Sequence, residues 1–218
     1  MKTDTDTLII GCGIGGAAAA LRLARDSQRH VTVVTRAPDP GESNTLYAQG
    51  GIVTLGPEDS PEKLINDVLA AGAGASLPRA AALLAAEGPG LVQRILIDEA
   101  GVPCERDAHG ELSYTMEGGH SARRVIHAGD ATGRAIELAL IERLKALPNV
   151  ELRSGATAVE LITSTHNTYD PLARYEAISC HGAYVLDQAT GTVETIVADA
   201  VVLATGGLGR RVGAGRCD

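Results

Sequence analysis

The sequence contains very few aromatic residues: five Tyr, no Phe and no Trp among 218 residues. Leu, Ile, Val and many Ala must therefore fill the core, and a core of such side chains favours helices packed closely on sheets. Apolar residues in general are not scarce, since they make up 44% of the chain beside 21% charged residues. These values are ordinary for a folded globular domain and argue against a disordered chain. The length allows one sizeable core and a small second lobe.

Cysteine and positive charge are also scarce. The four cysteines, Cys12, Cys104, Cys180 and Cys217, include no Cys-x-x-Cys pair, so we expect reduced thiols and neither a disulfide framework nor a zinc site. A net charge of −8 argues against a nucleic-acid partner or an anionic membrane, because both bind clustered Lys and Arg. We expect a cytoplasmic protein.

A long hydrophobic run is missing as well. The apolar stretch at 8–20 is shorter than the ~20 residues that a membrane span needs. Asp4 and Asp6 precede it, where a signal peptide carries positive charge. We therefore expect neither a signal peptide nor a membrane span in this segment.

A glycine-rich turn separates the first predicted strand, 7–10, from a predicted helix at 17–25, and a second strand follows at 30–35. This order fits one βαβ crossover. The turn satisfies G-x-G-x-x-G and consists of Gly11, Cys12, Gly13, Ile14, Gly15 and Gly16. The first glycine permits the tight turn, the second lets the backbone approach a pyrophosphate, and the third lets the helix pack on the strand. The helix N-terminus favours phosphate, so the motif predicts a dinucleotide site; a glycine turn without ligand is the alternative.

The residue after the second strand departs from the usual pattern. An acidic residue normally binds the ribose there, whereas this chain has Thr35 and Arg36. Arginine at this point can bind the 2′-phosphate of NADP, and a solvated arginine at a strand end is equally compatible with the pattern. From the residues alone, an NADP-dependent reductase remains a rival interpretation.

The rest of the chain alternates regular segments with two irregular, polar ones at 38–56 and 102–130, which we expect to carry a site. We predict helices over 60–69, 80–87, 89–100 and 136–147, strands over 150–153, 156–162 and 200–204, and a hairpin of 177–186 with 192–197. Ser60 and Pro61 are a favourable helix start, and Gly101 is a stop. The predicted fold class is α/β: a Rossmann-like domain with a parallel central sheet, helices on both faces and a small antiparallel hairpin.

The segment Ser43–Ile52 resembles the flavin-contacting segment of the succinate dehydrogenase and fumarate reductase flavoprotein superfamily. This resemblance implies FAD, through its ADP half at the glycine turn, rather than NADP. In the respiratory members a histidine of this segment carries the flavin covalently, and Asn44 stands at the matching position here. The resemblance therefore implies non-covalent FAD.

Several further segments, in the same order as in the family, resemble the L-aspartate oxidases. They are Tyr47–Ile52, Asp67–Gly74, Glu117–Ser121, Arg123–Gly133 and Ala198–Gly207. The resemblance extends from residue 7 to about 209, so we expect the N-terminal part of an FAD-binding domain at 1–209, followed by a non-matching basic, glycine-rich tail at 210–218. Family members are much longer, and we expect this chain to be an N-terminal portion that is incomplete and inactive by itself.

The resemblance also implies roles for individual residues. Gly13–Gly16 would bind pyrophosphate, Arg36 would lie beside the adenosine and Val159 would touch the adenine. The flavin would be lined by Asn44, Thr45, Leu46, Tyr47, Ala48, Gln49, Gly50 and Gly51, with Thr205 and Gly206 at the end of a second flavin strand. Glu117 matches a glutamate that orients the amino group of the substrate. A carboxylate can pair with the ammonium group of aspartate and hold its Cα–H towards the flavin.

The implied activity is FAD-dependent oxidation of L-aspartate to iminoaspartate in the quinolinate route of NAD biosynthesis, with oxygen or fumarate accepting the electrons. Quinolinate synthase is a possible partner. A soluble fumarate reductase-like flavoenzyme is one rival, against which Tyr47 and the 117–121 segment argue. A non-catalytic flavin-binding fragment is the other.

The polar cluster at 117–130 also permits other chemistry. Glu117 and His120 form Glu-x-x-His, but two glycines interrupt it and no second copy exists, which argues against a di-iron site. The histidines and Asp130 lack a standard zinc spacing, and Ser121 lacks the G-x-S-x-G elbow of a hydrolase. We predict no metal, a structural capping role for Ser121, Asp130 and Thr132, and a catalytic role for Glu117.

Overall fold

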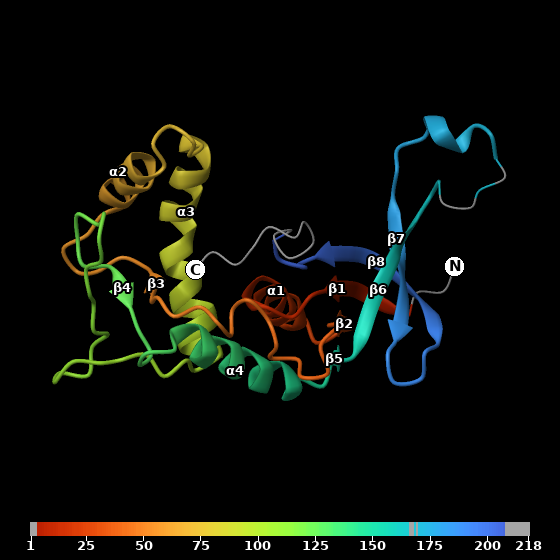
Figure 1. Cartoon of the computed structure of the whole chain (residues 1–218), viewed down its shortest axis with the longest axis horizontal. Coiled ribbons are helices and arrows are strands. Elements are labelled where there is room, and N and C mark those ends of the chain that lie inside the picture. The colour runs from red at the N-terminus through yellow and green to blue at the C-terminus, as the bar shows by residue number, and fades with distance from the viewer. Residues whose placement is uncertain (1–3, 166–167, 169, 208–218) are drawn as a thin grey trace. The chain divides into compact units, whose positions relative to one another are not determined.

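A computed structural model of the chain describes residues 4–165, 168 and 170–207 (Figure 1). The chain divides into two compact units, unit 1 with residues 1–44 and 141–218, and unit 2 with residues 45–140. A six-stranded sheet lies in unit 1, and a two-stranded sheet lies in unit 2. The predicted tail at 210–218 lies outside the described residues.

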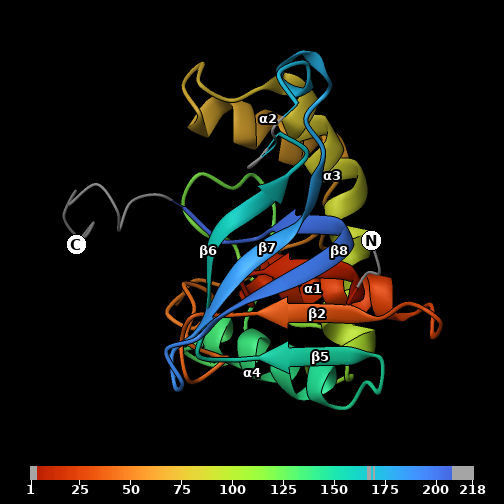
Figure 2. The same ribbon diagram turned by 90° about the vertical axis from the view of Figure 1, so that its right-hand side faces the viewer.

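The sheet of unit 1 has the strand order β5-β2-β1-β8-β7-β6 (Figure 2). Its strands are β1 Thr5–Ile10, β2 Val31–Val34, β5 Val150–Arg153, β6 Ala156–Thr163, β7 Cys180–Asp187 and β8 Val193–Leu203. The pairs β5-β2, β2-β1 and β1-β8 are parallel, whereas β8-β7 and β7-β6 are antiparallel. The α/β prediction is confirmed, with a mixed sheet that is parallel around the glycine turn.

One boundary prediction was wrong, because 192–197 and 200–204 are not separate strands. They form the single strand β8, whose first half pairs with β7 and whose second half pairs with β1. The predicted break falls at 198–199, where the polar Asp199 lies. In a strand, neighbouring side chains point to opposite faces, so one polar residue does not interrupt the ladder. The hairpin is therefore a continuation of the nucleotide sheet.

Helix α1, Ile14–Ala24, packs on β1 and β2. The buried core of the sheet is aliphatic and contains Leu8, Ile10, Val34, Ala156, Ala183, Val185, Ile196 and Ala198. The turn before β5 is tied to the segment after α1 by Asn149, whose Nδ2 donates to three main-chain carbonyls at 2.9–3.1 Å. Side chains of moderate size thus fill this core, as the scarcity of aromatic residues requires.

Unit 2 contains the helices α2, Pro61–Ala71, and α3, Pro78–Leu91, and the short strands β3, Ile52–Val53, and β4, Val125–Ile126. Ser60 begins α2 as predicted, since its Oγ accepts the N–H of Lys63 at 3.3 Å. Helix α4, Thr132–Lys145, starts in unit 2 and ends in unit 1.

The predicted break between helices near residue 88 is absent. Pro89 lies inside α3, which continues directly into the π-helix η1, Val92–Glu99. Proline removes one helical N–H donor, and the widened hydrogen-bonding pattern of a π-helix follows it within one turn. Gly101 has φ of +70° and ends the helical stretch, as predicted.

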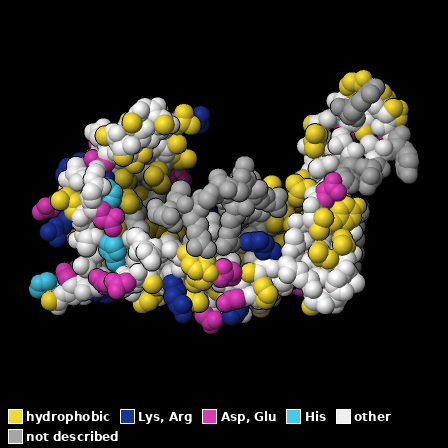
Figure 3. Space-filling model, in the orientation of Figure 1, with side chains coloured by type: hydrophobic (Ala, Val, Ile, Leu, Met, Phe, Trp, Pro, Cys, Tyr) yellow, Lys and Arg dark blue, Asp and Glu magenta, His cyan; other side chains and the backbone are white. Residues whose placement is uncertain are grey.

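Hydrophobic side chains gather on the surface over α3 (Figure 3), where Leu83 and Leu84 are each more than half exposed. The continuous helix Pro78–Glu99 reaches a mean hydropathy of 1.3, so by length and composition alone it could cross a membrane. Core helices of soluble proteins pass the same test. The absence of membrane contact therefore stays a prediction.

Candidate functional site

The glycine turn of unit 1 joins β1 to α1 and is closed by backbone contacts. Gly11 has φ of +108°, and a Cβ on it would fall 2.3 Å from the Ala204 carbonyl oxygen. A Cβ on Gly16 would fall 2.0 Å from the Gly11 carbonyl oxygen. Both positions therefore require glycine. Gly15, by contrast, faces open space, since nothing lies within 4 Å of an added Cβ.

The first turn of α1 suits an anion. Gly13 is the N-cap residue, with extended backbone, and no side chain caps the helix. The first turn carries no acidic residue, so no protein carboxylate opposes a phosphate at the positive end of the helix dipole. Cys12 is buried beneath the turn and Ile14 begins the helix. The geometry is that of a pyrophosphate cradle.

Several other predicted residues lie at the same edge of the sheet, where parallel strands end. β1 and β8 end together, since Ile10 pairs with Leu203. Arg36 is exposed just after β2, and Thr205 and Gly206 follow β8. The carboxyl edge of parallel strands is where ligands of open α/β sheets bind.

Asn44 belongs to this cluster. Its Nδ2 lies 3.8 Å from the point where a Cβ on Gly206 would be. Asn44 matches the residue that binds flavin covalently in the respiratory family members. It thus lies beside Gly206, at the end of the second predicted flavin strand. Two separate sequence segments meet here inside unit 1.

Val159 lies in β6 at a β-bulge, because the register with β7 shifts between Ala158 and Glu160. A bulge redirects a side chain, and Val159 is 60% exposed although it is apolar. Gln188 ties β6 to the end of β2, since its Nε2 donates to the Arg36 carbonyl at 2.7 Å and contacts Thr157 Oγ1 at 2.8 Å. An adenine contact for Val159 stays a prediction.

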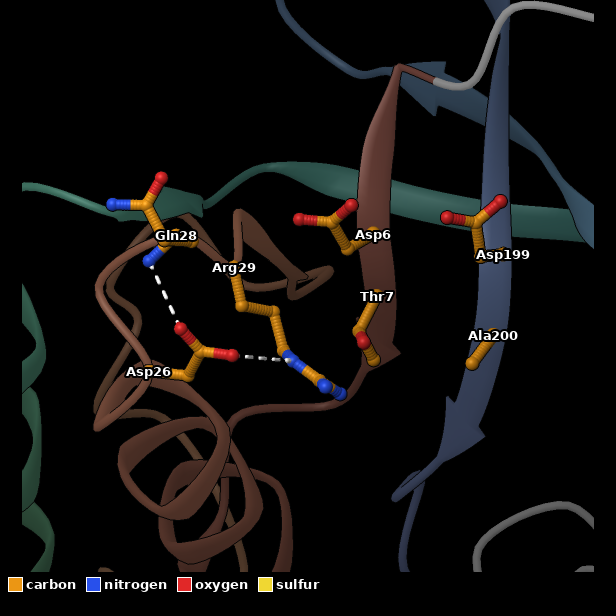
Figure 4. Close-up of a pocket in the computed structure, with 7 residues that line it drawn as sticks. All are labelled: Asp6, Thr7, Asp26, Gln28, Arg29, Asp199 and Ala200. Carbon is orange, nitrogen blue, oxygen red and sulfur yellow. Dashed lines mark hydrogen bonds and ion pairs between the residues drawn. The ribbon is translucent and has the colours of Figure 1, made fainter.

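A distinct pocket lies near the start of β1, away from the glycine turn that follows the end of this strand (Figure 4). Its lining is Asp6, Thr7, Asp26, Gln28, Arg29, Asp199 and Ala200. Three carboxylates face one guanidinium, and that guanidinium is paired with Asp26 at 4.0 Å. Such a lining repels a pyrophosphate, and the pocket contains none of the predicted cofactor residues.

The predicted flavin loop in unit 2, 45–51, is held at its first turn by the start of α4. The Ala48 carbonyl accepts the N–H of Gly133 at 3.0 Å. A Cβ on Gly133 would fall 2.1 Å from the Thr45 carbonyl oxygen, so only glycine allows this approach. Leu46 is half-buried, whereas Tyr47, Gln49 and the glycine at 50 are exposed. The loop therefore presents its later residues to solvent.

Glu117 begins a turn in which its carbonyl accepts the N–H of His120 at 3.1 Å. Its side chain is 49% exposed, and Oε1 lies 3.6 Å from His127 Nε2. A half-exposed carboxylate can accept an ammonium group from solvent. Binding of the ammonium group of the substrate by Glu117 stays a prediction.

Sequence reasoning missed a buried charge network behind this turn. Arg124 is fully buried, with Nε 2.8 Å from Asp59 Oδ2 and Nη1 2.8 Å from Asp67 Oδ2. The backbone N–H and the hydroxyl of Ser121 also donate to Asp67, both at 2.8 Å. The Ser121 N–H holds the pKa of Asp67 below its usual value, assisted by Arg124. The Asp67–Gly74 and Arg123–Gly133 segments of the resemblance contained the signal for this network.

No group of His, Cys, Asp and Glu side chains in the described part of the chain could hold a metal ion. Within 117–127, the side chains of Glu117, Ser121, Arg124 and His127 make the contacts given above or below, whereas the buried Nδ1 atom of His120 has no hydrogen-bond partner among the described residues. Thr132 is buried and its Oγ1 accepts the N–H of Ala128 at 3.1 Å, which holds the loop that leads into α4. Helix capping by Thr132 stays a prediction. Ser121 also has a structural role, through Asp67.

Comparison with known proteins assigns the family. A family model described as FAD binding domain matches residues 6–217. The chain belongs to this family. It is also a homologue of L-aspartate oxidases, being 39% identical over 208 residues to L-aspartate oxidase 1 of Ralstonia nicotianae and 40% identical over 206 residues to L-aspartate oxidase of Yersinia pestis. These alignments cover 94% and 93% of this chain but 37% of each relative, so the chain spans somewhat more than a third of their length.

Solved structures agree on the fold of this FAD-binding domain. A structure of E. coli quinol fumarate reductase superposes with a TM-score of 0.82 at 24% identity, covering 96% of this chain and 34% of that one. The Sdh1 complex of Mycobacterium smegmatis gives a TM-score of 0.80 at 27% identity, covering 94% and 35%. The predicted membership in the succinate dehydrogenase and fumarate reductase superfamily is confirmed.

Proposed function

We propose that this chain is the FAD-binding part of a flavoenzyme that oxidises L-aspartate to iminoaspartate. The glycine turn carries the proposal, because a Cβ at Gly11 or Gly16 would collide with backbone while the helix end beside it is left without a capping side chain. That cradle suits the pyrophosphate of FAD. Homology to L-aspartate oxidases supports the choice of substrate.

The residues of unit 1 suit the ADP half of FAD, and unit 1 also contains Asn44, the position that carries the covalent flavin link in the respiratory family members. Gly13–Gly16 would hold the pyrophosphate, and the exposed Arg36 would lie beside the adenosine. An amide at Asn44 cannot form the covalent flavin link that a histidine forms, so we propose that FAD is bound non-covalently. Bound FAD would supply a two-electron acceptor for a hydride from the substrate.

Glu117 would hold the substrate. Its half-exposed carboxylate would pair with the ammonium group of L-aspartate and fix the orientation of the Cα–H bond. Charge-assisted hydrogen bonds of this kind are directional, so they select one face of the amino acid. We propose oxygen or fumarate as final electron acceptor, quinolinate synthase as the consumer of iminoaspartate, and the cytoplasm as the location.

The test starts with the purified 218-residue chain, which is titrated with FAD while flavin absorbance reports binding. Acid precipitation then shows whether the flavin stays attached to the protein. We expect saturable FAD binding and release of the flavin by acid. Flavin that stays with the acid precipitate would contradict the assignment from Asn44, and absence of FAD binding would contradict the cofactor assignment.

Substrate binding is tested on the FAD-loaded chain by the change in the flavin absorbance spectrum on addition of L-aspartate, a readout that needs no turnover by this partial chain. Glu117→Gln should keep FAD and lose most of the response to L-aspartate, whereas Glu111→Gln, an exposed carboxylate of the same unit, should keep both. Flavin binding without any response to L-aspartate would favour a non-catalytic flavin-binding chain. Oxidation of reduced flavin by fumarate, without a response to L-aspartate, would favour a fumarate reductase.

A further inference from the structure

His127 contacts two segments of unit 2 to which the sequence assigns different tasks. Strand β4 ends beside the start of β3, since Ile126 pairs with Ile52, so His127 lies next to Gly51. A Cβ on Gly51 would fall 2.7 Å from the His127 ring atom Cε1. The Nε2 atom of the same ring lies 3.6 Å from Glu117 Oε1. The ring therefore lies between the predicted flavin loop, at Gly51, and Glu117, the residue predicted to bind the substrate amine.

The contacts of Thr115 bear on which nitrogen of the His127 ring carries the hydrogen. Its hydroxyl donates to the Val125 carbonyl at 3.3 Å, and the same oxygen lies 2.8 Å from His127 Nε2. A hydroxyl has one hydrogen, so when it donates to the carbonyl it must accept from Nε2. In that arrangement Nε2 carries the hydrogen, on the side of the ring where Glu117 lies, and the ring-nitrogen measurement below tests this assignment.

The histidine is held more firmly than the glutamate. The His127 carbonyl accepts the N–H of Glu105 at 2.8 Å, and its side chain is 22% exposed. The Glu117 side chain is 49% exposed. The better-held partner limits the range of the more exposed one, because the ring attracts the nearby carboxylate oxygen electrostatically.

We propose that His127 is a positioning residue, which sets the direction of the Glu117 carboxylate relative to the flavin loop without itself touching the substrate. This inference rests on the proposed function, because it gives Glu117 the task of holding the substrate amine. At 3.6 Å the contact is within ion-pair range but longer than a hydrogen bond, so the ring attracts the carboxylate without occupying its acceptor sites. The carboxylate thus keeps acceptor capacity for an ammonium group.

The contact is tested in the chain without cofactor by NMR of ¹⁵N-labelled histidine rings. His127→Gln identifies the His127 signals by their loss, and His109→Gln, at an exposed position of the same unit, is the control that removes a different signal. We expect the His127 Nε2 signal to show a bound hydrogen. Thr115→Val and Glu117→Gln should each shift it and leave other histidines unchanged. A Glu117→Gln spectrum with unshifted His127 signals would overturn the proposal.

The consequence is tested with the FAD-loaded chain. His127→Ala should raise the L-aspartate concentration for the half-maximal change in flavin absorbance about tenfold, which corresponds to ~1.4 kcal/mol. His127→Gln should restore most of this loss, since its amide supplies an N–H donor. Equal loss in both variants would contradict positioning through this N–H. Should the parent chain bind no FAD, the proposed function fails, whereas the ring-nitrogen result still decides whether His127 holds Glu117.

Discussion

Replacement of Arg124 by Met should destabilise unit 2 severely. The guanidinium spans two carboxylates: Nε and Nη2 lie 2.8 and 2.9 Å from the two oxygens of Asp59, and Nη1 lies 2.8 Å from Asp67. The side chains of Arg124 and Asp59 are both fully buried. Met matches much of the volume of arginine but leaves a buried carboxylate without its cation. Removal of one partner of a buried ion pair costs about 3–5 kcal/mol.

For a chain of this size, each kcal/mol lowers Tm by roughly 2–4 °C, so the loss should be ~6–20 °C. Thermal unfolding followed by circular dichroism, with urea unfolding as a second probe, measures it. Arg124→Lys keeps the charge but cannot bridge both carboxylates, so it should lie between parent and Arg124→Met.

The double variant Asp59→Leu with Arg124→Met is the decisive control. It removes the buried carboxylate together with its partner, and a buried ion pair replaced by apolar residues is often neutral in stability. The double variant should therefore recover a large part of the lost stability. A loss below ~1 kcal/mol in Arg124→Met, the range of exposed pairs, would refute the reasoning.

Three further predictions concern stability. Gly16→Ala places a Cβ 2.0 Å from a carbonyl oxygen and should lower Tm, whereas Gly15→Ala, with open space, should leave Tm nearly unchanged in the same thermal unfolding assay. Gly133→Ala, which clashes at 2.1 Å, should likewise be far less stable than Gly118→Ala, which meets nothing within 4 Å; equal Tm values would contradict the loop contact. Because the folded-state pKa of Asp67 is lowered, its stabilisation is complete above ~4 and is lost as pH falls through the folded-state value, so Asp67→Asn should flatten the acid side of a urea-midpoint profile.

Local patterns in the sequence predicted the nucleotide side of the fold well. Each part of the βαβ unit has its own local signal: an apolar strand, glycines at fixed spacing, a helix and a β-branched strand. The structure adds why Gly11 and Gly16 are needed, and the reason is a backbone approach. Ala204, more than 180 positions away, closes on Gly11 because β8 pairs with β1. No local pattern contains that pairing.

The prediction of secondary structure failed at two boundaries, one in a helix and one in a strand. Separate helices were predicted at 80–87 and 89–100, but α3 includes Pro89 and continues into the π-helix η1. The predicted strands 192–197 and 200–204 are one strand, because pairing with β7 and with β1 continues across the gap between them. For β8, the pairing of its first half with β7 and of its second half with β1 makes one continuous strand, and the local pattern contains neither pairing.

The charge network in unit 2 was missed for a related reason. Arg124 in a polar, irregular segment reads as a solvated residue, and its burial depends on Asp59 and Asp67, which lie more than 55 positions away. Only the resemblance placed Asp67 and Arg124 in segments of interest, and it gave them no role. Spacing along the chain does not indicate which charges will meet in a core.

The flavin loop is fixed within unit 2 at both of its ends. Its first turn is bonded to Gly133 at the start of α4, and its last residue, Gly51, packs on Val125 and His127 at the end of β4. Neither attachment involves a cofactor. A loop fixed in this way pays little ordering entropy when a ligand binds, which favours affinity. We therefore expect Gly133→Ala to weaken FAD binding in proportion to the displacement of the loop, even at temperatures where the variant stays folded.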